Sequence, residues 1–454
     1  MFIMAAMFWA KAITWQTMED LSLVPTGEED QSEMVVDRLS DLPWGIFNNI
    51  YQNMSIIDAI RLSVLARDWR HRWLSLSHFH LDVHDIGHFL RTRNIRWDIA
   101  ASIINKYLSQ HTSQIRTFSL RLFCANHYSD LYFWFQCLAQ KNIEDLLIIN
   151  YSRERFILPS YLFSFQNLVG LALSNCSLQI PPSFIRYNLV LRISLTDVTI
   201  SETDLDYLIS ACPLLEKLNL FNIQQLQHLR IRAPRVISLK VDSRFESFTI
   251  AAPSLIEIVI SDSFRGTWVG LFPNWSNLSN GLRGVDSLLS LSLYGDLLKL
   301  IAIGFENQAF PFMNTSLTSL SLHRVRFDNV QVFMVCLSLL CCCPNITDFF
   351  FSIFSAKGPT LIKTFLKETQ ERALTFPKLK SLEVLCLERV GMGATIKFIE
   401  FIITASPNLK RVTIAREGPL VMNPKRITQM ISRFRKRCPH ATVNYVYEGQ
   451  VVHL

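Results

Sequence analysis

Twelve copies of one apolar pattern follow residue 110, and each copy reads apolar, two other residues, apolar, one other residue, apolar. The last two apolar residues of a copy lie two positions apart, so on a short strand both side chains point to the same face. Successive copies start about 19 to 33 residues apart, which leaves room for a return segment between strands. The copies begin at Ile115, Ile143, Leu168, Val190, Leu215, Val236, Leu255, Leu288, Leu317, Ile346, Leu379 and Leu409.

A repeat of this length predicts an α/β fold of the leucine-rich-repeat type, in which a curved parallel sheet has helices and loops on its outer side. The solenoid should be irregular, because residues 168–176 match the full L-x-x-L-x-L-x-x-C unit while other copies have Val198, Ile223 or Val325 at the ninth position. Short units between Pro234 and Ile260 should have loops on the outer side, and residues 261–284 are interpreted as an inserted loop. Return helices are expected at 202–211 with Ser201 and Asp204 as the cap, at 361–374 and at 394–404.

The stretch from Asp37 to Leu76 is too short to bury a core alone, yet too apolar to be left in water. Its first helix should hold Pro43 in the first turn, with Ser40 or Asp41 as the cap. Asp58 should cap a second helical run with two apolar stripes, namely Ile57, Ile60 and Val64 on one side and Leu62, Leu65, Trp69 and Trp73 on the other. One stripe can pack inside the chain and the other needs a further surface, which indicates a docking module.

Leu-Pro, an amphipathic helix, Asp-Ala-Ile-Arg, Ser-Val-Leu, a basic residue, Trp-Arg and Trp-Leu follow one another between residues 42 and 74. This order resembles the F-box of plant F-box proteins. The resemblance implies a three-helix module that binds a Skp-type adaptor and, through it, a cullin. Trp44-Gly45 stands where the family has an acidic pair, and residues 53–55 stand where it has Leu-Pro. The implied adaptor-binding residues are Leu42, Pro43, Ile46, Phe47, Ile50, Ile60, Leu62, Val64, Leu65, Trp69 and Trp73.

In the tail, residues 376–379, 382–384, 398–405, 406–410 and 412–414 are similar to the FBD region, which follows leucine-rich repeats in many plant F-box proteins. From its residues alone the tail is interpreted as two more strand–helix units with a cap. The expected domains are a flexible extension at 1–36, the F-box at 37–80, a helical joint at 81–110, leucine-rich repeats at 111–375, and FBD-like terminal repeats with a cap at 376–449.

Composition and motifs favour binding over catalysis. Hydrophobic residues make up 49% of the chain and charged residues 18%, so much side-chain surface must be buried. The sequence holds no P-loop, dinucleotide fingerprint, zinc-protease motif or nucleophile elbow. Cysteines 341–343 stand in succession without C-x₂-C pairs, and the clustered His78, His80, His84 and His88 have no cysteine partner. We therefore expect no enzyme activity, no cofactor and no metal.

The sequence also bears on compartment and on partner class. The first ten residues are apolar but lack the basic start of a secretory signal, and the apolar run Val332–Cys343 is too short to cross a bilayer. Cysteines without a disulfide pattern indicate a cytoplasmic or nuclear protein and no membrane contact. A net charge of +7 is mild for 454 residues. The basic run 433–437 is either a nuclear import or nucleic-acid patch or a solvated helix face, and we favour the second interpretation.

Residues that alternate with the buried ones on each strand form the candidate substrate surface, because they mix polar and aromatic side chains as protein-binding surfaces do. The first hypothesis is a substrate-recognition subunit of an SCF-type (Skp–cullin–F-box) ubiquitin ligase. The alternative is a non-catalytic interaction scaffold with a weakened F-box, while an enzyme or a hormone co-receptor has no motif in its favour. The candidate surface residues are Arg192, Ser194, Lys217, Asn219, Phe221, Lys240, Asp242, Tyr294, His323 and Arg411.

Overall fold

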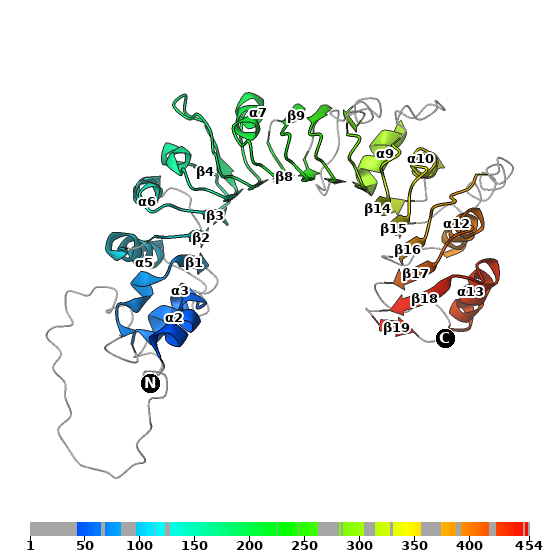
Figure 1. Cartoon of the computed structure of the whole chain (residues 1–454), viewed down its shortest axis with the longest axis horizontal. Coiled ribbons are helices and arrows are strands. Elements are labelled where there is room, and N and C mark those ends of the chain that lie inside the picture. Colours follow the sequence, from blue (N-terminus) through cyan, green and yellow to red (C-terminus); the bar gives the residue numbers. More distant parts are fainter. Residues whose placement is uncertain are drawn as a thin grey trace, which may run out of the picture. The chain divides into compact units, whose positions relative to one another are not determined.

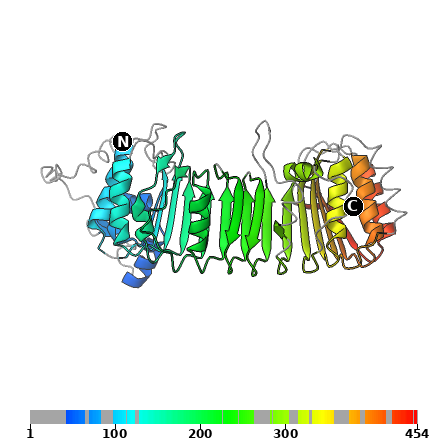
Figure 2. The same cartoon turned by 90° about the horizontal axis from the view of Figure 1, so that it is seen from above.

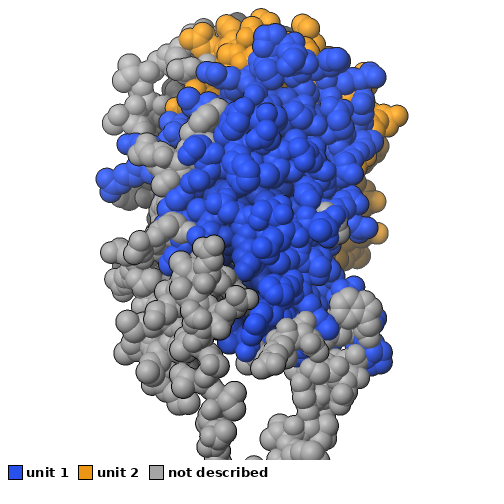
Figure 3. Space-filling view, turned by 90° about the vertical axis from the view of Figure 1, so that its left-hand side faces the viewer, with its two compact units in different colours: residues 1–190 blue, residues 191–454 orange. Residues whose placement is uncertain are grey.

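The computed structural model describes residues 43–64, 69–82, 97–112, 114–122, 128–224, 226–243, 245–261, 281–282, 285–303, 314–326, 330–355, 374–386, 392–416, 424–447 and 450–452. The chain divides into two units, residues 1–190 and 191–454, coloured blue and orange in Figure 3. The expectations for the extension at 1–36 and for Ser40 and Asp41 lie outside the described residues, as do nearly all of the helix at 361–374 and most of the loop at 261–284.

All twelve predicted strands are present, and in every copy the three apolar residues are buried. The strands of the first unit are β1 (His78–Asp82), β2 (Thr117–Leu122), β3 (Asp145–Asn150), β4 (Phe156–Ile157), β5 (Gly170–Ser174) and β6 (Cys176–Ser177). Those of the second unit are β7 (Arg192–Thr196), β8 (Lys217–Phe221), β9 (His228–Arg232), β10 (Ser238–Asp242), β11 (Ser247–Ala251), β12 (Glu257–Ser261), β13 (Ser290–Tyr294), β14 (Ser319–Arg326), β15 (Asp348–Ser355), β16 (Ser381–Cys386), β17 (Arg411–Arg416), β18 (Thr442–Tyr447) and β19 (Gln450–Val452).

Parallel pairing keeps the repeats in register. The first unit has the strand order β1-β2-β3-β5, and the second has β7-β8-β10-β12-β13-β14-β15-β16-β17-β18-β19. Leu218 on β8, for example, lies beside Ile193 on β7 and Leu239 on β10. Because equivalent positions meet across each pair, inward side chains form continuous apolar rows. The predicted α/β fold with stacked parallel strands is confirmed.

Helices return the chain between strands. The first unit contains α2 (Trp44–Gln52), α3 (Ile56–Leu62), α5 (Trp97–Gln110), α6 (Tyr128–Ala139) and the short 3₁₀ helices η3 (Arg72–Ser75) and η4 (Ser160–Ser164). The second contains α7 (Glu202–Ser210), α9 (Gly295–Ile303), α10 (Val330–Cys341), α12 (Met392–Ala405) and α13 (Pro424–Arg437). Within the second unit, the helices lie on one face of the sheet (Figure 1). Figure 2 shows the strands of this unit side by side. The described helices therefore leave the other face of this sheet open.

Helix starts agree only in part with the expectations. Ser201 accepts a hydrogen bond from the backbone N–H of Asp204 at 3.0 Å, so the predicted cap of α7 is confirmed. The prediction that Asp58 caps α3 is wrong, because Ser55 is the cap. Its hydroxyl accepts from the Asp58 N–H at 3.1 Å and donates to the Asp58 carboxylate at 2.8 Å. Pro43 is the residue before α2 and does not lie within its first turn.

The stretch expected to be a helical joint belongs to the repeats. β1 pairs in parallel with β2, and Leu76, Phe79 and Leu81 are all buried at the spacing of the repeat triplet. Helix α5 is then the return helix of this first repeat. This triplet falls at the end of the stretch that resembles an F-box, so the sequence assigns it to the F-box and not to the repeats. The solenoid therefore begins at residue 78, within the stretch predicted to be the F-box.

Two further differences concern strands. The units between Pro234 and Ile260 were expected to have a looped outer side, but β11 lies in this range and pairs in parallel with β9, which precedes it. Their sequences alternate, with Leu229 and Ile231 buried on one strand and Phe248 and Ile250 on the other, which is a strand signal in its own right. At the end of the second unit, β19 pairs antiparallel with β18. No repeat triplet marks that last strand.

Neighbouring residues on β14 test the assignment of faces. Leu320 is 0% exposed, whereas Ser321 points to the open face. Leu320→Ala should lower the free energy of unfolding by about 2–5 kcal/mol, because it leaves a cavity between repeats. Ser321→Ala should change it by less than about 0.5 kcal/mol. Urea denaturation followed by far-ultraviolet circular dichroism measures both, and equal shifts would contradict the assignment.

Candidate functional site

Helix α2 is fixed to the first repeat through one side chain. The Gln52 carboxamide oxygen accepts from the Ser77 backbone N–H at 3.0 Å and from the Ser77 hydroxyl at 3.1 Å. The Gln52 amide nitrogen donates to the Ser75 carbonyl at 3.4 Å. Tyr51, which is buried, donates its hydroxyl to the Ala59 carbonyl on α3 at 3.5 Å. These contacts hold α2 in position relative to α3 and β1.

Several predicted adaptor-binding residues remain exposed in this arrangement. Ile46 and Ile50 are 54% and 50% exposed, and Val64, two residues after the end of α3, is 66% exposed. Ile46 and Ile50 lie four residues apart on α2, so they share a face. Pro43 is also exposed, and Leu62 is half-buried. These side chains form what we call the F-box apolar set: Pro43, Ile46, Ile50, Leu62 and Val64.

Three other predicted residues are instead part of the core. Ile60, Trp69 and Trp73 are 7%, 4% and 6% exposed. The resemblance to the F-box implied that these side chains bind the adaptor, and their burial removes them from the surface we propose. The physical reason is that the first repeat lies next to the F-box and covers the face that carries the tryptophans. Leu42 and Leu65 lie outside the described residues, as does the side chain of Phe47.

An aromatic cluster explains the burial of Trp73. Its ring stacks near Tyr107 of α5, with centroids 6.5 Å apart, and Tyr107 lies 4.4 Å from Phe79 of β1. Phe79 stacks in turn on Phe118 of β2 at 5.0 Å. Tyr107 also donates its hydroxyl to the Leu76 carbonyl, and burial raises the pKa of its phenol. The cluster Trp73–Tyr107–Phe79–Phe118 therefore joins the F-box to the stack.

The open sheet face of the second unit carries the predicted substrate residues. Register places Arg192 beside Lys217, Ser194 beside Asn219, and Lys240 beside Asn219 on its other side. Phe221 lies beside Asp242, and Tyr294 beside His323. Arg192, Lys217 and Arg411 are exposed and the other seven are half-buried. The alternation rule thus placed all ten on the open face, although the binding of a substrate there stays a prediction.

An aromatic stack crosses this face. The Tyr294 and His323 rings are stacked with centroids 4.3 Å apart, and His323 lies 4.9 Å from Phe350 on β15. Burial lowers the pKa of His323. Phe350 was not among the candidate residues, although alternation with the buried Phe349 and Phe351 would have assigned it to the open face. We call Tyr294, His323 and Phe350 the aromatic stack.

The described residues contain no group of three or more His, Cys, Asp or Glu side chains arranged to hold a metal ion. His78 and His80 hydrogen-bond instead to the hydroxyls of Thr117 and Ser119 on β2; His84 and His88 lie outside the described residues. Burial raises the pKa of the Cys212 and Cys336 thiols to about 12, which disfavours the nucleophilic thiolate. No helix in the described part of the chain has the length and apolar character needed to cross a membrane.

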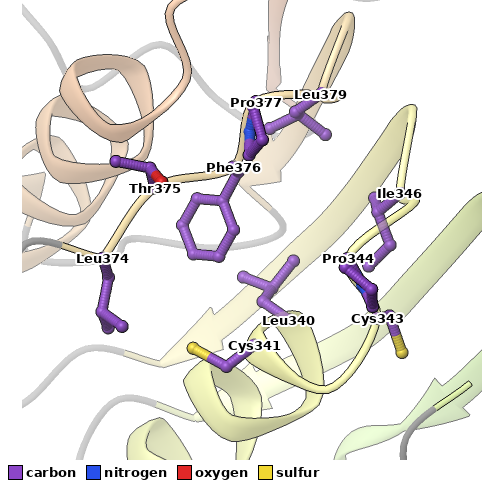
Figure 4. Close-up of a pocket in the computed structure, with 10 residues that line it drawn as sticks. All are labelled: Leu340, Cys341, Cys343, Pro344, Ile346, Leu374, Thr375, Phe376, Pro377 and Leu379. Atoms are coloured by element: carbon purple, nitrogen blue, oxygen red, sulfur yellow. The ribbon is translucent and has the colours of Figure 1, made fainter. Parts of the chain in front are cut away.

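An apolar hollow of about 160 Å³ lies at the C-terminal end of α10, and Figure 4 shows the residues that line it. The Phe376 ring points toward Leu340, and Cys341 lies beside them at the rim. Sites for drug-sized ligands are usually roughly 300–1,000 Å³, so this hollow is small for one. It also lies at a helix end and not on the open sheet face, where the co-receptor hypothesis would need a pocket.

Comparison with known proteins adds family information to this geometry. The family model described as the F-box domain matches residues 39–81, and the one described as FBD-associated F-box protein At5g56370, LRR repeats, matches residues 131–270. The chain is 29% identical to the F-box/FBD/LRR-repeat protein At1g13570 of Arabidopsis thaliana, over 84% of this chain and 91% of that protein. It is 24% identical to the FBD-associated F-box protein At1g66310 of the same organism, over 85% and 91% of the two chains. It is 22% identical to F-box/LRR-repeat protein 13, over 84% and 89%.

These matches confirm the resemblance to plant F-box proteins with leucine-rich repeats and an FBD region. The matched residues lie in the expected order, with the F-box match at 39–81 before the match to leucine-rich repeats of FBD-associated F-box proteins at 131–270. The F-box match ends at residue 81, inside β1. The overlap agrees with the structure, in which the F-box and the first repeat share a boundary without a linker.

Paired substitutions separate core from surface in the F-box. Trp73→Ala should lower the free energy of unfolding by about 3–5 kcal/mol, because it removes a buried ring from the aromatic cluster. Ile46→Ser should change it by less than about 0.5 kcal/mol, since that side chain is mostly in water. Denaturant titration monitored by tryptophan fluorescence and circular dichroism measures both. A larger loss for Ile46→Ser than for Trp73→Ala would reverse the assignment.

His323 should make stability depend on pH. Its pKa is lowered in the folded state, so the unfolded chain takes up the proton first as the pH falls through about 6.5. The stability gained from the neutral ring is present above that pH and is lost below it. His323→Phe keeps a ring in the aromatic stack and removes the proton. The variant should lose less stability than the original between pH 8 and pH 5, and the same loss in both would refute this role.

Proposed function

We propose that the chain is the substrate-recognition subunit of an SCF-type ubiquitin ligase. In this proposal the F-box binds a Skp-type adaptor, the adaptor connects the chain to a cullin, and the repeats bind a protein to be ubiquitinated. The observation that supports it most is an F-box match whose helices keep large apolar side chains in water.

The F-box apolar set has a physical reason to bind. Single exposed apolar residues are common on protein surfaces, but Ile46 and Ile50 lie on one helix face and are each at least half exposed. Fully burying such a side chain contributes about 1.5–3 kcal/mol. Two of them covered by an adaptor, with Val64 nearby in sequence, would contribute a substantial part of a stable interaction.

The buried tryptophans have a supporting role in this proposal. Trp69 and Trp73 are in the core of the first unit, and the aromatic cluster connects Trp73 to α5 and β1. A surface held by packed aromatic side chains loses little conformational entropy on binding. The F-box apolar set is thus pre-organised by residues that themselves make no contact with the adaptor.

The open sheet face is the proposed substrate surface. Its candidate residues come from parallel strands in fixed register, so their spacing is set by the sheet. Charged residues are mixed with Phe221 and the aromatic stack, a combination found in protein-binding surfaces. The proposal includes the FBD-like repeats at 376–449 as part of this surface.

The proposed mechanism makes and breaks no bonds within this chain. A chain that binds ligase and substrate together raises the effective concentration of substrate lysines near a conjugating enzyme carried by the same assembly. The buried, unreactive thiols are consistent with this non-catalytic role. We place this activity in the cytoplasm, the nucleus or both.

One observation favours the alternative, an interaction scaffold with a weakened F-box. Pro43 makes no side-chain cap hydrogen bond at the start of α2, and Gly45 in its first turn costs about 1 kcal/mol relative to alanine. A poorly initiated α2 would present Ile46 and Ile50 less firmly. The scaffold would keep the substrate surface and lose the ligase.

Adaptor capture distinguishes the two functions. The doubly substituted Ile46→Ser, Ile50→Ser chain should bind a purified Skp-type adaptor about 100-fold more weakly than the original, because two apolar contacts are lost. Isothermal titration calorimetry with the full chain measures the affinity.

The matched control is Ile157→Ser with Ile185→Ser. These two isoleucines belong to the same unit and are 53% and 77% exposed. The control should bind the adaptor like the original chain. Failure of the original chain to bind the adaptor would favour the scaffold, and equal weakening by both pairs would show that the F-box apolar set is not the contact.

A further inference from the structure

Positive charge is concentrated in the FBD-like repeats. Residues 376–449 contain 13 Lys and Arg and five Asp and Glu, a net charge of +8, whereas the whole chain has a net charge of +7. The remaining residues are therefore slightly acidic in total. A mild net charge for the chain conceals a strongly basic end.

Some of these basic side chains make contacts within the protein itself. Arg435, Lys436 and Arg437 occupy the last turn of α13, where cations are favourable beside unpaired carbonyls. Arg437 pairs with Glu400 of α12 at 3.6 Å, and Arg435 donates to the Val443 carbonyl at 3.5 Å. Arg416 is buried. Structural roles therefore account for much of the basic run on α13.

Four other cations gather where β16 and β17 begin. Lys380 and Lys410 each directly precede a strand, and the Lys410 backbone N–H donates to the Lys380 carbonyl at 2.8 Å. Arg411 opens β17 and lies beside Ser381 and Thr442. Lys378 is two residues before Lys380, and its ammonium donates to the Asn345 carboxamide at 2.6 Å. We call Lys378, Lys380, Lys410 and Arg411 the basic edge.

The described residues place no carboxylate in ion-pair distance of the basic edge. All four side chains are exposed, and none lies within 4.0 Å of a carboxylate among the residues that the structure describes. Like charges on adjacent strands repel one another. An anionic partner would relieve that repulsion and would be attracted from a distance at low salt.

We propose that the basic edge binds an acidic segment of the protein substrate. This inference rests on the proposed function and adds the chemical class of the substrate: an exposed run that carries several carboxylates or phosphates. The edge borders the open sheet face, since Arg411 belongs to both. A substrate lying on that face can therefore place an acidic run on the four cations.

The surroundings favour a peptide over a nucleic acid. Asp348 on β15 and Glu383 on β16 are exposed on the neighbouring part of the sheet, and a polyphosphate chain would be repelled by both. Binding of single strands usually relies on aromatic rings that stack on bases. Among the described residues between 374 and 447 no aromatic side chain is classed as exposed. A peptide can restrict its negative charge to the basic edge.

Charge reversal tests the proposal on the full chain. The probe is a fluorescein-labelled twelve-residue peptide of alternating Glu and Ser, with a Gln and Ser peptide as neutral control and a phosphoserine version as the second anionic form. Lys380→Glu with Lys410→Glu should weaken binding of the Glu peptide by about tenfold or more in fluorescence anisotropy. Raising the salt from about 0.05 M to about 0.5 M should weaken binding to the original chain.

The charge-matched control is Arg232→Glu with Arg235→Glu, two exposed residues at the end of β9 and before β10. It should bind the Glu peptide like the original chain. The proposal is overturned if both pairs weaken binding equally, if the neutral peptide binds as well as the Glu peptide, or if a single-stranded DNA of equal charge binds more tightly than either anionic peptide.

Adaptor capture by the same preparations separates this proposal from the function on which it rests. The Lys380→Glu, Lys410→Glu chain should bind the adaptor like the original, and an unchanged far-ultraviolet circular dichroism spectrum and denaturation midpoint verify that its second unit is folded. Loss of peptide binding with adaptor capture intact supports the basic edge. If the original chain binds the Glu peptide but does not bind the adaptor, the result supports the basic edge and overturns the ligase assignment.

Discussion

The burial of two inward side chains on each parallel strand is the constraint on which the rest of the structure depends. A single strand–helix unit cannot cover those side chains, so each unit needs a neighbour on either side. Leu218, between Ile193 and Leu239, shows this dependence in one row. Because the core uses one face of every strand, the intervening residues are released from packing and can differ from unit to unit.

The same constraint explains how the F-box is attached. β1 adds to the sheet beside β2, and its buried Phe79 contacts both Tyr107 and Phe118. Trp73 packs on this cluster from the F-box side. The two helices α2 and α3 therefore share a core with the first repeat. Their exposed side chains are the ones that do not pack in this core.

The proposed function depends on surfaces. The described thiols with strongly raised pKa values are buried, His78 and His80 pair with hydroxyls, His323 stacks on an aromatic ring, and the apolar hollow near α10 is small. The features with unmet physical requirements are exposed apolar residues on α2 and clustered cations at the start of β16 and β17. Each requirement is of a kind that a protein partner can satisfy.

Local patterns were sufficient for the twelve predicted strands, because alternation has a period of two residues and each triplet carries its own phase. The cap of α7 was equally local, since Ser201 and Asp204 lie three residues apart. By contrast, only the tertiary structure decided which apolar residues of the F-box are buried, because both stripes contribute buried side chains while Val64 stays exposed. Amphipathicity says that a face needs cover and not what covers it. It also decided that Lys380 and Lys410, 30 residues apart in sequence, are neighbours, since sheet register and not sequence distance sets which side chains meet.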